Sequence, residues 1–80
     1  MHFPTIDNLE PVWVLEVILP EWGNEIQDEC KSRVHTMSLA YVYMRESRKK
    51  WMLTYNHIGS VEWTADDGSI LLAHVIYKVN

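Results

Sequence analysis

The side chains best suited to chemistry in this sequence are its four histidines, His2, His35, His57 and His74. Histidine ligates metal ions and transfers protons near neutral pH. A metal site is usually signalled by a His-x-x-x-His or Cys-x-x-Cys spacing. Neither spacing occurs, and Cys30 is the single cysteine. The sequence therefore predicts structural or solvent-facing histidines, a buried thiol and no metal site.

Carboxylates and hydroxyls give no stronger sign of catalysis. Asp66 and Asp67 precede Gly68, and this tripeptide between strand-forming residues is typical of a hairpin turn. No nucleophile motif surrounds any of Ser32, Ser38, Ser47, Ser60 and Ser69. A catalytic triad assembled in space leaves no sequence signature. The interpretation favoured by the residues is a protein that is not an enzyme and has no cofactor.

A basic cluster is the candidate nucleic-acid site. It consists of Arg45, Arg48, Lys49 and Lys50, followed by Trp51. Cations bind phosphates, and an adjacent ring can stack on a base. The alternative is a helix C-terminus whose bases complement the helix dipole, with the indole in the core. The net charge of −4 and the pI of about 5.4 favour this alternative, because nucleic-acid-binding domains are usually basic.

Acidic residues are concentrated in the first third of the chain. Residues 7–29 contain seven acids and no base, whereas residues 31–50 contain six bases and one acid. Carboxylates on a small domain can occupy a basic groove that normally receives a phosphate backbone, and electrostatic attraction speeds such an association. We therefore expect Glu21, Glu25 and Asp28 to face a basic protein partner; the alternative is a solvated acidic surface.

The remaining elements are expected to pack against one amphipathic helix, residues 24–47. On a helical wheel, an arc of about 120° contains most of its apolar residues. They are Ile26, Cys30, Val34, Met37, Ala40, Tyr41 and Met44. Asn24 is a favoured N-cap, and Gln27 is placed for a capping box. An alternative interpretation breaks the helix near His35 and makes residues 36–45 a strand.

The opposite face of this helix is the predicted contact site. It carries His35, Leu39, Val42, Tyr43 and Glu46. A helix that packs on a sheet through one face has no need of apolar residues on the other, so they indicate a partner surface. The alternatives are scattered apolar residues or a helix covered on both sides.

Four further segments are predicted to be strands: residues 12–19, 50–56, 61–64 and 70–79. Turns are expected at residues 56–60 and 66–68, and residues 1–10 are expected to be a lead-in arm. The sequence thus predicts a single α+β domain, residues 1–80, with the order β-α-β-β-β. We expect an antiparallel-rich, four-stranded sheet with one long helix on one face, the last three strands forming a meander.

The composition is that of a globular protein. Of 80 residues, 48% are hydrophobic and 22% are charged. The chain has no secretory signal pattern and no apolar run near 18 residues, and its one cysteine permits no internal disulfide. These features predict a cytoplasmic protein that does not contact membranes.

Size, charge and the lack of catalytic motifs together predict a small protein-binding domain. We expect an inhibitor or adaptor that occludes a functional surface, such as a nucleic-acid-binding surface, of a larger host complex. Small acidic domains of this kind occur among phage and mobile-element proteins with anti-defence or anti-CRISPR-like roles. One alternative is a homodimer formed through the outer face of the helix, and the other is a nucleic-acid binder that uses residues 45–51.

Overall fold

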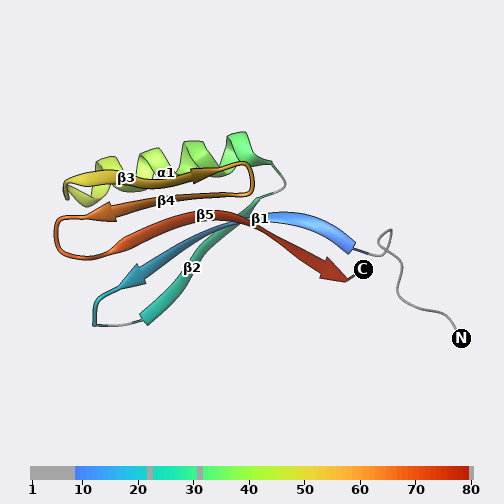
Figure 1. The fold of residues 1–80 in the computed structure, drawn as a ribbon, viewed down its shortest axis with the longest axis horizontal. Coiled ribbons are helices and arrows are strands. Elements are labelled where there is room, and N and C mark those ends of the chain that lie inside the picture. The colour runs from blue at the N-terminus through green and yellow to red at the C-terminus, as the bar shows by residue number, and fades with distance from the viewer. Residues whose placement is uncertain (1–8, 22, 31, 80) are drawn as a thin grey trace, which may run out of the picture.

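Five antiparallel strands form one sheet in the computed structural model of this small α+β domain, and one helix packs on the sheet (Figure 1). The structure describes residues 9–21, 23–30 and 32–79. Its elements are β1 (Leu9–Leu19), β2 (Gly23–Cys30), α1 (Arg33–Ser47), β3 (Trp51–His57), β4 (Ser60–Ala65) and β5 (Ile70–Val79). Of the expected lead-in arm, residues 1–8 lie outside the described residues, and residues 9 and 10 begin β1.

The strand order across the sheet is β2-β1-β5-β4-β3. The meander predicted for the last three strands is confirmed, since β3, β4 and β5 pair in sequence order. The first strand then pairs with the last, with Leu15 opposite Ala73 and Val17 opposite Leu71. This places β5 in the middle of the sheet and leaves β2 and β3 at its two edges.

The predicted start of the helix is wrong, because residues 23–30 form the strand β2. Gly23 has a φ of +77°, which suits a tight turn after β1 and carries no penalty in a residue without a Cβ. The chain therefore reverses and pairs with β1, with Asn24 opposite Ile18 and Cys30 opposite Trp13. Cys30 is buried as expected, but it lies on a strand.

The helix begins after Ser32, whose hydroxyl accepts a hydrogen bond of 3.1 Å from the backbone N–H of His35. A serine N-cap satisfies one of the free N–H groups of the first turn. The helix ends at Arg48, which adopts the left-handed conformation with a φ of 59°. Residues 36–45 are helical throughout, so the alternative that makes them a strand is also wrong. In the part of the chain that the structure describes, no helix has the length and apolar character needed to span a membrane.

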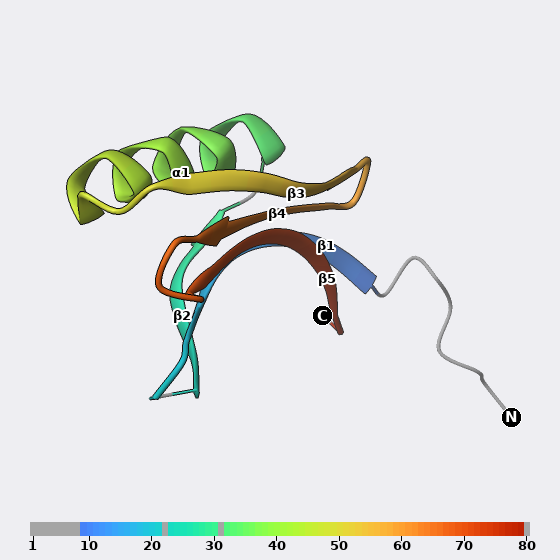
Figure 2. The same cartoon turned by 60° about the vertical axis from the view of Figure 1, so that its left-hand side comes forward.

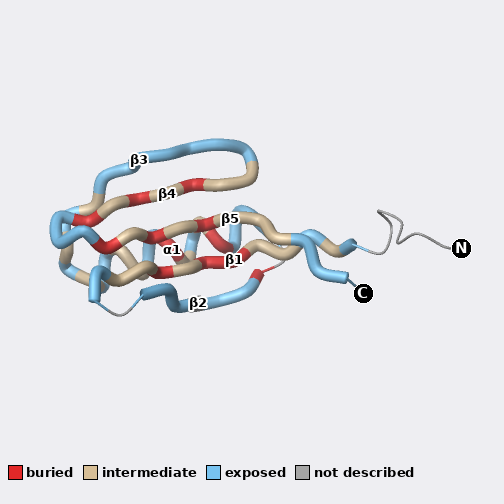
Figure 3. Tube along the Cα trace, turned by 60° about the horizontal axis from the view of Figure 1, so that its bottom comes forward, coloured by how far each residue is buried: buried red, intermediate tan, exposed pale blue. Residues whose placement is uncertain are grey.

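The core lies between α1 and the strands β1, β4 and β5 (Figures 2 and 3). Its buried members are Leu15, Val17, Ala40, Val61, Trp63, Leu71 and Ala73. From the helix, Met37, Leu39, Tyr43 and Met44 pack against them. The core-facing side of α1 is thus rotated by about 60° from the predicted stripe, at 100° per residue. Val34 and Tyr41, which were expected inside, are exposed.

Candidate functional site

The three acids expected to face a partner lie together at one edge of the sheet. Glu21 is in the turn between β1 and β2, and Glu25 and Asp28 are on β2. All three are exposed, and none of them takes part in an ion pair with another described residue. The neighbouring Glu29 is different, because Lys78 of β5 lies 2.8 Å from its carboxylate. The β2 edge therefore presents uncompensated negative charge.

The five residues of the predicted contact face of the helix are not all exposed to solvent. Leu39 and Tyr43 are half-buried and pack against the core, so their placement on the solvent side is wrong. His35, Val42 and Glu46 are exposed as expected. The reason is the rotation of the helix, which turns the Leu39 and Tyr43 side toward the sheet.

The basic cluster is divided by the fold. Trp51 is half-buried, its indole N–H donates a 2.8 Å hydrogen bond to the hydroxyl of Ser47, and its ring meets that of Tyr43 edge-on at 6.2 Å. The indole is thus held against the helix, and Trp51 also lines a cleft at the start of β3. Lys49 is engaged in an ion pair, described below, whereas Arg45 is exposed. Arg48 and Lys50 are exposed as well.

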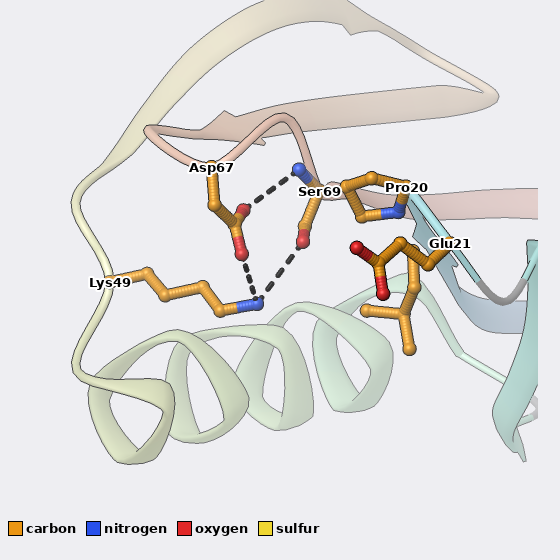
Figure 4. A pocket seen from close by; sticks show the side chains of 6 residues that line it. Pro20, Glu21, Lys49, Asp67 and Ser69 are labelled. Atoms are coloured by element: carbon orange, nitrogen blue, oxygen red, sulfur yellow. Dashed lines mark hydrogen bonds and ion pairs between the residues drawn. The ribbon is translucent and has the colours of Figure 1, made fainter.

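A cleft of about 410 Å³ lies where the end of β1 meets the β4–β5 turn (Figure 4). Lys49 reaches into it from the link between α1 and β3 and lies 2.8 Å from the carboxylate of Asp67. Its ammonium also donates a 3.1 Å hydrogen bond to the hydroxyl of Ser69. The backbone N–H of Ser69 donates to Asp67 at 2.9 Å. Leu19, Pro20 and Glu21 form the remaining lining.

The Lys49–Ser69 contact has the composition of a nucleophile with its base, a pairing that sequence spacing gave no reason to expect. Its surroundings argue for a structural role. The Nζ of Lys49 is paired with the carboxylate of Asp67, and Ser69 is fully buried. Asp67 belongs to the hairpin turn predicted at residues 66–68, where Gly68 has a φ of +90°, and Ser69 directly follows that turn. Lys49 therefore clamps this turn to the end of the helix.

The clamp predicts a pH-dependent stability. The Lys49 ammonium, with hydrogen bonds from Ser69, lowers the pKa of Asp67 from 3.8 to about 2. The stabilisation is therefore complete above pH 3.8 and is lost as the pH falls toward about 2. We expect Asp67→Asn to melt below the parent near neutral pH, with the gap closing at about pH 2. Thermal melting followed by circular dichroism across this range measures the gap.

The adjacent Asp66 provides the control, because it is exposed and its side chain makes no hydrogen bond to another described residue. Asp66→Asn should melt like the parent at every pH. A gap for Asp67→Asn that stays constant from neutral pH to about pH 2 would show that the charge of Asp67 is irrelevant to the clamp.

The described histidines are dispersed. His35 is exposed on α1, and His57 stacks on Tyr55 with ring centroids 6.1 Å apart. His74 lies on β5 opposite Val14, and its Nε2 is buried without a hydrogen-bond partner among the described residues. In the part of the chain that the structure describes, no three His, Cys, Asp or Glu side chains gather in a way that could hold a metal ion.

An apolar surface at β3 was not anticipated from the sequence. Met52, Leu53 and Tyr55 keep between 51% and 70% of their surface exposed, although they are in a strand. Among the described strands, it lies at the edge of the sheet and pairs with β4 alone. A second cleft of about 410 Å³ opens at the start of β3, with Met52, Thr54 and Thr64 in its wall. Strand order would have revealed this edge, but order cannot be obtained from the pattern of apolar residues.

Comparison with known proteins does not assign the chain to a class. No protein-family model, no curated protein and no solved structure matches it. The functional argument therefore rests on the surfaces described above.

Proposed function

We propose that this chain is a non-enzymatic protein-binding domain that docks its acidic β2 edge on a basic surface of a larger partner. In this role it acts as an inhibitor or adaptor, occluding a surface such as one that binds nucleic acid. An origin among phage or mobile-element proteins, with an anti-defence function, is part of the proposal and follows from size and charge class alone.

The observation that carries the proposal is the grouping of Glu21, Glu25 and Asp28. They lie within eight consecutive positions, on the edge strand β2 and in the turn that precedes it. Charge on an edge strand also discourages pairing with other strands. Its value to binding is in steering, since complementary fields raise association rates by about 10- to 1,000-fold.

The proposal is tested by association kinetics. The partner is first captured from an extract with the immobilised protein, identified and purified. Its association with the parent is then compared with that of a triple variant, Glu21→Lys, Glu25→Lys and Asp28→Lys, at low and high salt. We expect association at low salt to slow by about tenfold or more and its salt dependence to flatten, because the attraction between unlike charges is lost.

Two single variants separate the β2 edge from net charge. Glu25→Lys and Asp66→Lys change the charge of the protein equally, but Asp66 lies in the β4–β5 turn. Only Glu25→Lys should slow association. Equal association rates for the parent and the triple variant at low salt would show that the acidic edge has no role in binding. Equal effects of the two single variants would show that net charge, not the position of the acids on β2, determines the association rate.

Neither alternative function gains support from a particular observation. A homodimer through the outer helix face loses Leu39 and Tyr43 from its interface, since they pack in the core. A nucleic-acid site loses Lys49 to its ion pair, and the half-buried Trp51 has its indole N–H bonded to Ser47.

A further inference from the structure

The two edges of the sheet differ in charge. β2 contains three acids, Glu25, Asp28 and Glu29, whereas β3 contains no charged residue over its seven positions. Both edge strands carry an irregularity, between Leu15 and Glu16 in the β1–β2 ladder and between Leu53 and Tyr55 in the β3–β4 ladder. Native sheets protect exposed edges with charges and bulges. The β3 edge has a bulge but no charged residue, so it is the less protected of the two edges.

The surface along β3 is self-complementary. Its first half borders the cleft of about 410 Å³, whose wall includes Met52, Thr54 and Thr64. Its second half carries the exposed ring of Tyr55. Both features lie on the sheet face away from α1, because Tyr55 is opposite Glu62, and Thr54 bonds to the Glu62 carboxylate at 2.9 Å and to Thr64 at 3.1 Å. An antiparallel copy of the strand would place its ring beside this cleft.

We propose that the β3 edge is the contact surface for a second copy of this chain. The two β3 strands pair antiparallel about a two-fold axis perpendicular to the sheet, and each Tyr55 enters the cleft of the other copy. Such an isologous contact uses the same patch twice and closes as a dimer. The exposed Leu53, on the α1 side of the strand opposite Trp63, adds apolar contact on the other face.

The charge distribution is compatible with a second copy as the occupant. Each chain has a net charge of −4, and its acidic edge is β2, four strands away from β3. In a continuous ten-stranded sheet the two β2 edges would stand roughly 40 Å apart, at about 4.8 Å per strand. This greatly exceeds the Debye length of about 8 Å at physiological salt, so the acids of the two copies do not repel. Both β2 edges also remain open.

The test is the mass of the purified protein in solution. By sedimentation equilibrium over about 5–200 μM, the parent should approach twice the chain mass of 9.4 kDa. Leu53→Lys and Tyr55→Lys should each weaken the dimer by about tenfold or more, because they bring a charge to an apolar contact. Val34→Lys is the control, since Val34 is also apolar and exposed but lies on α1.

Circular dichroism melting of each variant confirms that it folds, and amide exchange provides a second measurement. In the parent, residues 51–57 should exchange more slowly at high than at low protein concentration. A parent that stays monomeric throughout, a Leu53→Lys variant that remains dimeric, or a Val34→Lys variant that dissociates would each overturn the proposal. If the parent is monomeric and Leu53→Lys instead abolishes binding of a foreign protein, the edge accepts a foreign strand. The dimer through β3 does not depend on the proposed function of the acidic edge. That function is tested separately, by the rate at which variants at the β2 edge associate with a partner.

Discussion

Replacing Ala40 with aspartate will strongly destabilise this domain, whereas the same change at the next residue, Tyr41, will be tolerated. Ala40 is 0% exposed where α1 meets the sheet, and Tyr41 is 58% exposed. A carboxylate at position 40 would be buried among Leu71, Ala73 and their neighbours without a partner. The cost is roughly 3 kcal/mol or more, a large part of the 5–15 kcal/mol that stabilises a typical domain.

Chemical denaturation of the two variants measures this difference directly. Tyr41→Asp should lose about 1 kcal/mol, because it removes the edge-on contact of its ring with Trp63 at 6.0 Å but leaves no buried charge. If instead Tyr41→Asp were the more damaging of the two, the helix would face the sheet through the side that the sequence pattern predicted.

A second large loss of stability is expected from the double variant Leu39→Ser, Tyr43→Ala. Both side chains pack against the core, and the ring of Tyr43 also meets Trp51. Truncating a packed leucine or aromatic ring costs about 2–5 kcal/mol at a fully buried site. Because these two are half-buried, we expect about 3 kcal/mol for the pair, measured by urea unfolding.

Val42→Ser is the control for this variant, since Val42 lies on the same helix but is exposed and outside the core. It should change the free energy of unfolding by about 0.5 kcal/mol or less. If the double variant has the same free energy of unfolding as the parent, Leu39 and Tyr43 are not core residues. They would then again be candidates for a contact site.

The sequence predicted the elements whose patterns are local. The strands that became β1, β3, β4 and β5, the turn at residues 66–68 and most of α1 follow from apolar spacing and turn residues. The strand β2 did not, because Gly-Asn-Glu-Ile-Gln-Asp-Glu-Cys has few strand-forming residues and its acids suit a helix N-terminus. It is a strand because the edge of β1 offers hydrogen bonds, and this tertiary effect overrides local preference.

The predicted contact site was displaced because the apolar arc overlaps only partly with the side of the helix that faces the core. The arc included Ala40 but left out Thr36, which is buried. Leu39 and Tyr43 were then assigned to solvent. The acidic residues were identified correctly as exposed, because charge predicts exposure whatever the local fold. The β3 edge required the order of strands, which depends on contacts between distant parts of the chain.

The position of β5 has a consequence for folding during synthesis on the ribosome. Of the five strands it is the last to be synthesised, yet it alone joins the β1–β2 hairpin to the β3–β4 hairpin. Until it emerges, two separate hairpins and a helix have no common sheet, and isolated two-stranded hairpins are marginally stable in water. The apolar sides of β1 and β4 stay uncovered throughout that interval. The five-stranded sheet is therefore completed only when β5 pairs with both β1 and β4.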